Sequence, residues 1–563
     1  MRKKNIALNL AYSGLFLLIV FIMLYPFWRP HQLVVLSDWS FHASRVEEIF
    51  LNLKAGQWLT TIASQTFQGT GSGTFLFYPT PLLYLWAGLR FIAAPLTAFF
   101  LWLGLLIWAG LTISFFCCYR LTHRRQQALI FSLVYNLLPY RLMLGLGVFT
   151  LAEFVATLFL PLVFLGFYQL LKGKLTDWPL LSLGMTLILY THLLTAILAT
   201  EIMTVLLLAV LIYTRHFTKP QWIALLKSIG LTIGLTLPII IPFFTDFIGQ
   251  SVATVSQGIA FLLPLNDVVL NSLGNQLTPG IGILLLVPII FYSKLAGDNH
   301  RYQLATMIGG LLLLVSTAIF PWTLLSHTFL AVVQMPYRYL SFAGLFLAVA
   351  FAKLAQIGLT KTSLNTKPII GLGLILIVSG GLYFGEVATT ITRNQTGAQL
   401  TALPQPKTVG ATLPEPFLLR NQNYANQFAY RVKWGETDYF PQKSLAHSES
   451  IINNQTYLNH HAIKLRKVSA PNQITYQIKL AKHSVLDFPV VRYHQTTLHV
   501  DGQAQPLQTS FRGTVQTELA AGKHTVSIGY QPSKWFFASL FIAFASWLGL
   551  AVAVISKWWH SKH

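Results

Sequence analysis

Apolar runs, each about 20 residues long, recur along the chain and are separated by short polar segments. A helix of this length matches the thickness of the hydrocarbon core of a bilayer. Only 10% of the 563 residues are charged, whereas a soluble protein of this size has about 25%. The chain is therefore predicted to be a polytopic α-helical membrane protein.

The apolar runs predict about 12 membrane-spanning helices. They cover residues 6–27, 97–119, 126–142, 150–171, 178–194, 196–213, 222–244, 279–293, 303–320, 338–356, 368–387 and 534–555. The segment 79–95 is apolar but short, and we expect a re-entrant or interface-lying helix there. If this segment crosses the membrane, the count rises to 13 or 14.

The predicted topology explains much of the net charge of +22. If the N-terminus is cytoplasmic and the spans alternate, most Lys and Arg residues of the short loops fall on the cytoplasmic side. No nucleic-acid partner is needed to explain the charge. We expect a multi-pass protein of the cell membrane with both termini in the cytoplasm.

Composition divides the chain into three predicted regions. Residues 1–387 form a multi-span domain with an external loop at 28–78. Residues 388–533 are polar, and the segments ITYQIKLA, TTLHVDG and HTVSIGY alternate polar and apolar residues with the period of a β-strand. We expect an extracytoplasmic β-sandwich there. Residues 534–563 form the last spanning helix and a short cytoplasmic tail.

The external loop concentrates charge in LSDWSFHASRVEE, residues 36–48. This stretch holds three of the chain's 17 acidic residues, Asp38, Glu47 and Glu48. A helix is predicted from Trp39 onward, with Ser37 or Asp38 as its N-cap, because a short side-chain oxygen accepts hydrogen bonds from the first helical turn.

The two faces of this predicted helix differ in polarity. The polar face holds Asp38, Arg45, Glu48 and Asn52. We expect the helix to lie in the membrane interface, with this face toward solvent or a cavity. The segment QGTGSGTF, residues 68–75, is predicted to be a flexible turn.

Placing an ionisable residue inside a membrane span costs roughly 2.5 to 3.5 kcal/mol of insertion free energy, so its presence there needs an explanation. The ionisable residues inside the predicted spans are Arg141, Glu153, His192, Glu201 and Arg338. Together with the charged residues of 38–48, they are all assigned to the outer side of the membrane, which indicates a functional site. The alternative is that each pairs locally or extends its side chain to the lipid headgroups.

Several motifs resemble those of bacterial membrane proteins. They are SDWSFHASRVEEI, FLFYPTPLLYLW, VYNLLPYRLMLGLGVFTLAEFVATLFLPLVFLG, THLLTA, QMPYRYLSF, and TLHVDGQAQPL followed by LAAGKHTVSIGYQPSKW. In this order they resemble the proteins labelled 6-pyruvoyl-tetrahydropterin-synthase-related and the YfhO-type branch of the GT-C glycosyltransferase superfamily. The chemistry of the pterin-synthase label has no counterpart in the sequence, which has no cluster of metal-spaced histidines.

This resemblance implies a GT-C-like fold and the transfer of a sugar from a polyprenyl-phosphate donor to an acceptor on the outer membrane face. In GT-C enzymes an acidic residue of the first external loop acts as base or binds a metal, and Asp38 occupies that place. Many of these enzymes have a second acidic residue directly after it, where this chain has Trp39. A divalent metal, bound by Asp38, is the one cofactor that the resemblance allows.

The chemistry of such a transfer selects the candidate residues. A carboxylate takes the proton of the acceptor hydroxyl as the new bond forms, and guanidinium groups bind phosphate through paired hydrogen bonds. The catalytic candidates are Asp38, Glu153 and His192. The substrate-binding candidates are His42, Arg45, Glu48, Tyr78, Arg141 and Arg338.

Two other functions stay open on the sequence: a transporter or flippase of lipid-linked glycans, and a non-catalytic protein that binds or assembles envelope polymers. A transporter is expected to carry ionisable groups near the membrane midplane and to have two similar halves, and neither is evident in the sequence. The expected partners are the lipid bilayer, a polyprenyl-phosphate-linked sugar, and a cell-surface glycan, teichoic acid or protein acceptor.

Overall fold

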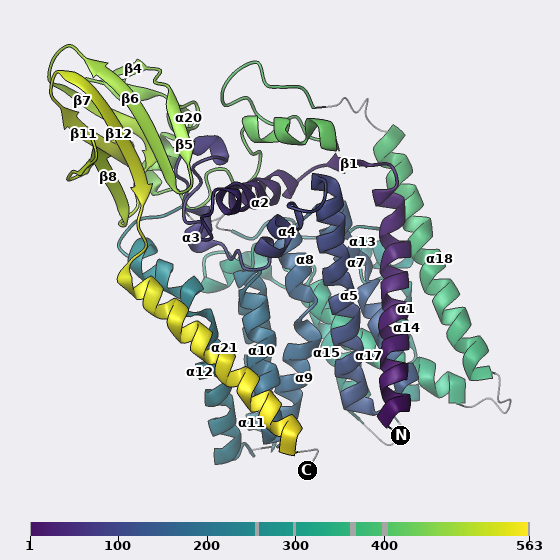
Figure 1. Cartoon of the computed structure of the whole chain (residues 1–563). Coiled ribbons are helices and arrows are strands. Elements are labelled where there is room, and N and C mark those ends of the chain that lie inside the picture. The colour runs from purple at the N-terminus through teal and green to yellow at the C-terminus, as the bar shows by residue number, and fades with distance from the viewer. Residues whose placement is uncertain are drawn as a thin grey trace. The chain divides into compact units, whose positions relative to one another are not determined.

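A computed structural model of the chain describes residues 2–214, 216–253, 258–296, 300–360, 367–396 and 403–560 (Figure 1). The chain divides into two compact units. Unit 1 comprises Met1–Pro30, Phe100–Ser228 and Ser256–Leu400. Unit 2 comprises His31–Phe99, Ile229–Val255 and Thr401–His563. Most of the predicted external loop 28–78 therefore folds in the same unit as the C-terminal part of the chain.

Unit 1 is helical. Its longer helices are α1 (Arg2–Trp28), most of α5 (Pro95–Thr122), α6 (Arg125–Asn136), α8 (Leu151–Thr157), α9 (Leu160–Leu171), α10 (Trp178–Leu189), α11 (Leu193–Thr214), α13 (Leu265–Leu273), α14 (Ile283–Ile290), α15 (Arg301–Val315), α17 (Tyr339–Thr360) and α18 (Lys367–Thr396). Each predicted span of this unit overlaps one of these helices or the short helix α7 (Pro139–Leu142). The apolar runs thus form helices because a helix satisfies all its backbone groups within one segment.

Among the described residues, fewer helices than the predicted 12 are by themselves long and apolar enough to cross a membrane. Seven helical segments are long and apolar enough to cross a membrane, or eight if the bent pair α6–α7 counts as one span. The helices α10 and α14 have only 12 and 8 residues, and a crossing takes about 20. The polytopic helical class is confirmed, whereas the count of 12 is not.

The short segment 79–95 contains α4 (Leu83–Leu89), which belongs to unit 2. Its seven residues extend over about 10 Å at 1.5 Å per residue. The hydrocarbon core of a bilayer is about 30 Å thick, so α4 alone cannot cross it.

Some helices of unit 1 are buried within the protein and others face outward. In the segment Leu151–Leu171, 89% of the apolar window is buried, compared with 28% in Leu193–Thr214. The helices α9 and α10 lie side by side (Figure 1). A Cβ atom on Gly166 would lie 2.4 Å from the backbone nitrogen of Leu181, so the two backbones approach closely only because residue 166 has no side chain.

Unit 2 contains the predicted β-sandwich (Figure 1). Its strands are β3 (Thr456–Leu458), β4 (His461–Ile463), β5 (Lys467–Ala470), β6 (Gln473–Leu480), β7 (Ser484–Val491), β8 (Thr496–Val500), β9 (Gln503–Ala504), β10 (Gln508–Thr509), β11 (Thr514–Leu519) and β12 (Gly522–Tyr530). They form two five-stranded sheets, ordered β10-β11-β7-β3-β4 and β5-β6-β12-β8-β9. Every pairing is antiparallel, so the prediction of an antiparallel β-domain is confirmed.

The core of the sandwich takes apolar residues from both sheets. Ile474 and Val526 come from one sheet, Phe488 and Val515 come from the other, and all four are fully buried. The alternation that predicted these strands is visible in β6, where every second residue is buried. The strands begin at Thr456, and α18 extends to Thr396, so the sandwich occupies the second half of the range 388–533.

The rest of unit 2 consists of short elements and two apolar helices. They are β1 (Gln32–Val35), α2 (Trp39–Lys54), η1 (Phe67–Gly69), α3 (Thr74–Phe77), the end of α12 (Lys219–Pro242), β2 (Phe417–Arg420), η8 (Asn421–Ala429), α19 (Gln442–Ala446), α20 (Ser448–Ile452) and α21 (Lys534–His560). The strands β1 and β2 form a separate antiparallel pair. This pair joins the external loop to the segment that precedes the sandwich.

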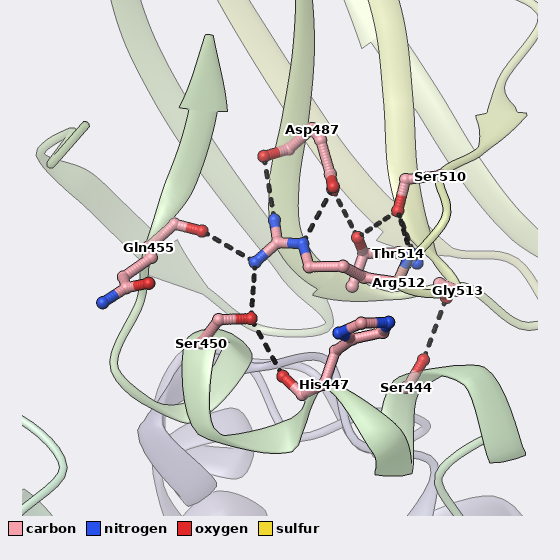
Figure 2. Close-up of polar contacts among 9 residues, drawn as sticks. All are labelled: Ser444, His447, Ser450, Gln455, Asp487, Ser510, Arg512, Gly513 and Thr514. Atoms are coloured by element: carbon pink, nitrogen blue, oxygen red, sulfur yellow. Dashed lines mark hydrogen bonds and ion pairs between the residues drawn. The ribbon is translucent and has the colours of Figure 1, made fainter. Parts of the chain in front are cut away.

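A buried arginine, Arg512, forms an ion pair within the sandwich and a hydrogen bond to α20 (Figure 2). Arg512 Nε donates to Asp487 Oδ2 at 2.8 Å, and the two side chains are 0% and 6% exposed. Arg512 Nη1 donates to Ser450 Oγ at 3.1 Å and to the carbonyl oxygen of Gln455 at 3.0 Å. The guanidinium also lies 4.4 Å from the ring centroid of Tyr457. These contacts together compensate the positive charge of the buried Arg512.

Replacing Arg512 with Met should lower the free energy of unfolding of unit 2 by about 3 to 5 kcal/mol, because Asp487 would remain buried without its cation. Hydrogen exchange of β7 and β11 in the purified, detergent-solubilised protein would measure the loss. The matched control is Arg431→Met, which breaks an ion pair with Glu449, whose carboxylate is 75% exposed. That change should cost at most about 1 kcal/mol, and equal effects of the two substitutions would contradict the assignment.

Candidate functional site

Asp38 lies directly before α2 in unit 2. It occupies the N-cap position, but its side chain makes no capping hydrogen bond, so the prediction that Ser37 or Asp38 caps the helix is wrong. The residue is half-buried, and the hydroxyl of Ser37 donates to Asp38 Oδ1 at 3.3 Å.

Trp39, which follows Asp38, anchors the start of α2. It is 0% exposed, and its Nε1 donates to Gln427 Oε1 at 3.0 Å. Its ring packs against Trp86 and Phe99, with centroids 5.7 Å and 4.7 Å away. The position that holds a second acidic residue in many GT-C enzymes therefore has a packing role here.

The polar face of α2 is buried, which corrects the prediction that it faces solvent or a cavity. Glu48 is 0% exposed. Its two oxygens accept hydrogen bonds from the backbone N–H groups of Ser64, Gln65 and Thr66 at 2.6 to 3.1 Å. The hydroxyls of Ser64 and Thr66 also donate to it, each at 2.9 Å. The loop folds around this carboxylate because its donors would otherwise be buried without a partner.

The segment QGTGSGTF is an ordered, buried turn and not the flexible one predicted. Ala63 N donates to Ser72 O, and Gly71 N donates to Ala63 O, both at 2.9 Å. Lys467 Nζ donates to the carbonyl oxygens of Gln68 and Gly69. These bonds fix the turn on both sides. Burial also lowers the pKa of Lys467 to about 8.

Arg45, His42 and Tyr78 form part of one packed cluster. Arg45 Nη2 donates to the carbonyl oxygens of Tyr78 and Pro79 at 2.9 Å and 2.7 Å. The guanidinium lies 4.5 Å from the ring centroid of Tyr78, and the ring of His42 meets the same ring edge-on at 6.1 Å. Burial lowers the pKa of Arg45 to about 10. These contacts hold the loop, and the predicted substrate-binding roles of Arg45, Glu48, His42 and Tyr78 stay predictions.

Three acidic residues that we did not predict as functional lie in the segment before the sandwich. Burial raises the pKa of Glu415 and of Glu436 to about 7, and the pKa of Asp438 to about 6. Because acidic residues are rare in this chain, the same scarcity that drew attention to residues 36–48 could have identified these three.

The direction of these shifts sets a pH dependence. In the unfolded chain, Asp and Glu have pKa values of about 4, so the folded state binds these protons more tightly. The resulting contribution to stability is present at acid pH, and it is lost as the pH rises through about 6 to 7.

In unit 1, Glu153 and Arg338 form an ion pair. Arg338 Nε donates to Glu153 Oε2 at 3.1 Å, and the side chains are 11% and 6% exposed. The hydroxyl of Tyr140 donates to Glu153 Oε1 at 2.7 Å. Arg338 Nη1 donates to the carbonyl oxygen of Val333 at 3.0 Å and to Gln334 Oε1 at 3.2 Å. Both oxygens of Glu153 are therefore engaged, and the Arg338 guanidinium is held in one orientation.

The two Pro-Tyr-Arg turns of the sequence differ in what their arginines contact. The rings of Tyr140 and Tyr337 meet edge-on, with centroids 5.9 Å apart. Arg141 is 0% exposed and donates to Thr157 Oγ1 and to the carbonyl oxygen of Tyr135, both at 2.9 Å. The first arginine thus connects α6 to α8 inside the unit, whereas the second belongs to the Glu153 cluster.

His192 and Glu201 have local partners in the same unit. His192 Nδ1 lies 2.8 Å from Thr195 Oγ1, and Arg338 acts on the ring electrostatically. The hydroxyl of Tyr339 donates to Glu201 Oε2 at 2.7 Å. Glu201 therefore has a local partner, as expected if its role is structural. The catalytic role of His192 stays a prediction.

The donor set for a metal ion is limited. Among the residues that the structure describes, no group of three or more His, Cys, Asp and Glu side chains is arranged to hold one. A metal held by Asp38 would therefore need ligands from outside this set, such as the phosphate oxygens of a substrate. The metal stays a prediction.

No family model matches the sequence, and no curated protein matches it. Among solved structures, ArnT from Cupriavidus metallidurans bound to undecaprenyl phosphate is similar, with a TM-score of 0.45 and 11% identity over 81% of this chain and 93% of that chain. The arabinofuranosyltransferase AftD from Mycobacteria has a TM-score of 0.48 and 14% identity over 92% of this chain and 40% of that chain. Similarity at this level assigns neither the activity nor the ligands of those proteins to this chain.

Replacing Glu48 with Gln should destabilise the loop that carries Asp38, because the new amide group would face N–H and O–H donors. Each buried donor left without a partner costs about 1 to 3 kcal/mol, so we expect a loss of roughly 3 kcal/mol or more. Limited proteolysis and hydrogen exchange of residues 60–72 would detect it. The neighbouring Glu47→Gln serves as the control, since it breaks only one ion pair, with Arg90 at 2.6 Å. A stable Glu48→Gln protein would argue against this role.

Proposed function

We propose that the protein is a membrane glycosyltransferase that moves a sugar from a polyprenyl-phosphate donor to a cell-envelope acceptor on the outer face of the membrane. The apolar helices supply an environment for the polyprenyl chain. The motifs around Asp38 resemble those of the GT-C superfamily. The observation that carries the proposal is the position of the Asp38 carboxylate, which is half-buried at the start of α2, a helix whose polar face is buried.

Asp38 acts as the general base in this proposal. An acceptor hydroxyl attacks the anomeric carbon of the donor sugar and gives its proton to the Asp38 carboxylate. As the new carbon–oxygen bond forms, the bond between the anomeric carbon and the phosphate oxygen breaks. The polyprenyl phosphate leaves with the electron pair. The lipid anchors the donor, so the reaction needs no site for a soluble nucleotide.

Arg338 is proposed separately as a contact of the donor phosphate. Its guanidinium is held by Glu153, Val333 and Gln334, so its orientation is fixed before a ligand arrives. A pre-oriented planar fork loses little freedom when it binds an anion. Glu153 is then a positioning residue, because both of its oxygens are engaged by Tyr140 and Arg338.

Replacing Asp38 with Asn should abolish sugar transfer, with a loss of at least about a hundredfold, because the amide cannot accept the proton. Transfer from a polyprenyl-phosphate-linked sugar would be measured in proteoliposomes that contain the purified protein. The matched control is Glu449→Gln, which alters a carboxylate that is 75% exposed, and this variant should keep wild-type activity.

Thermal unfolding of both variants would show that folding is intact. Full transfer activity in Asp38→Asn would remove this residue from the mechanism. A flippase would instead move the lipid-linked glycan across the vesicle membrane without changing its covalent structure. That outcome would favour the transport alternative over transfer.

Substitution by Lys should have different effects at the two arginines of the Pro-Tyr-Arg turns. Arg338→Lys loses the planar fork and should raise the KM for the donor at least about tenfold, with a smaller effect on stability. Arg141→Lys should lower the unfolding temperature, because the buried guanidinium donates to Thr157 and Tyr135. Steady-state kinetics at varied donor concentration, together with thermal unfolding, would separate the two. Unchanged donor dependence in Arg338→Lys would favour simple contact with lipid headgroups.

A further inference from the structure

One sheet of the sandwich turns a polar surface away from the core. It is the sheet β5-β6-β12-β8-β9 (Figure 1). In β6 every second residue is buried, and the residues between them point outward, because neighbouring side chains of a strand lie on opposite faces. The register with β12 shows which residues of that strand share the outward side. We name six outward residues of these two strands the lysine face: Thr475, Gln477, Lys479, Lys523, Thr525 and Ser527.

Two lysines lie directly opposite each other at one end of the lysine face. Lys479 pairs with Lys523 in antiparallel register, and both side chains are exposed. The Cβ atoms of such a pair lie about 4.5 to 5.5 Å apart, and like charges placed opposite each other destabilise a sheet. An anion bound between the two ammonium groups would remove this repulsion.

No acidic side chain on this side of the sheet neutralises the two lysines. Every outward-facing residue of β6, β12 and β8 is neutral or basic. Residues 456–530 contain three acidic residues, and each has another side chain as its partner: Arg512 for Asp487, His524 for Asp501 and His483 for Glu518. Within the described part of the chain, Lys479 and Lys523 therefore have no carboxylate partner.

The rest of the lysine face carries hydroxyl and amide groups. The hydroxyls of Thr475 and Ser527 lie 3.0 Å apart across the two strands. Gln477 and Thr525 form the next outward pair toward the lysines, and both are exposed. Groups of these types both donate hydrogen bonds to and accept them from the hydroxyls of a sugar or polyol. They extend from the lysine pair over four residues of strand, which is about 13 Å.

The sandwich as a whole is positively charged. Residues 456–530 contain eight Lys and Arg residues and three Asp and Glu residues. Under the predicted topology this domain is extracytoplasmic, so the preference of cytoplasmic loops for Lys and Arg does not account for its charge. A positive surface of this kind attracts anionic partners.

We propose that the lysine face binds a polymer that carries phosphate groups between hydroxylated units, and that this polymer is the acceptor of the sugar. The tetrahedral oxygens of one phosphate accept hydrogen bonds from both ammonium groups. The hydroxyl and amide groups of the face bind the adjoining unit of the polymer. The identification of the polymer as the acceptor rests on the proposed function, whereas its binding to the sandwich does not.

The composition of the lysine face favours a polymer over the phosphates of a lipid surface. Protein surfaces that lie in a membrane interface insert large apolar side chains among the lipids. The lysine face has none. Beside it, Val468 of β5 lies opposite Thr475 and is a single exposed aliphatic residue on the edge strand.

Binding of phosphorylated dextran to the full-length protein in phosphatidylcholine nanodiscs tests the surface, with isothermal titration calorimetry as the measurement. The double variant Lys479→Gln, Lys523→Gln should raise the Kd at least about tenfold, because two charge-assisted contacts are lost. The matched control is Lys407→Gln, Lys443→Gln, which removes the same charge from exposed positions of unit 2 outside the two sheets. The control should keep the wild-type Kd. Equal losses in the two double variants would show that only total charge matters and would overturn the proposal.

Three further ligands separate the polymer from its parts and from lipid. Unmodified dextran should bind at least about ten times more weakly than phosphorylated dextran, because it has no phosphate. Gln477→Ala should weaken the binding of phosphorylated dextran but not of inorganic polyphosphate, which has no polyol hydroxyls. Vesicles of phosphatidylglycerol should bind the wild type and the Lys479/Lys523 variant equally. Loss of vesicle binding with unchanged polymer binding in that variant would overturn the proposal in favour of a membrane contact.

A transfer assay with the same polymer tests its identification as the acceptor. In proteoliposomes supplied with a polyprenyl-phosphate-linked sugar, the Lys479/Lys523 variant should raise the KM for phosphorylated dextran at least about tenfold and keep kcat, because Asp38 is unchanged. An unchanged KM would overturn the identification of the acceptor. Polymer binding in a wild-type protein that transfers no sugar would instead contradict the proposed function and leave the binding surface in place.

Discussion

A charged group that leaves water must find a partner, and this constraint accounts for most buried ionisable side chains of the protein. In unit 1, Arg141 is surrounded by oxygen acceptors and Arg338 is paired with Glu153. In unit 2, Glu48 collects the N–H and O–H donors of a whole loop, and Arg512 is paired with Asp487 inside the sandwich. Each of these side chains joins segments from different parts of the chain.

Glu415, in the segment before the sandwich, follows the same pattern, because its carboxylate lies 3.8 Å from Lys433 Nζ. The loop that carries Asp38 is fixed by two buried side chains: Glu48 binds the backbone of residues 64–66, and Trp39 binds Gln427.

Much of the architecture could be predicted from the sequence, and the errors share one cause. Length and apolarity identified the helices, and strict alternation identified strands such as β6. The cap at Asp38, the exposed polar face of α2 and the flexible turn at 68–75 were predicted from local pattern alone and are wrong. In the last two cases another segment supplies the partner: residues 64–66 for Glu48, and Lys467 for the turn.

The sequence by itself determined that the chain forms apolar helices and an antiparallel β-domain, because hydrophobic periodicity is a local property of each segment. It also made Asp38 a candidate, because charge in so apolar a chain is rare. Only the tertiary structure decided which partner each buried charge takes. The loop backbone binds Glu48, and Lys467 binds the turn at 68–69, because contacts between segments that are apart in the sequence are not encoded by any local pattern.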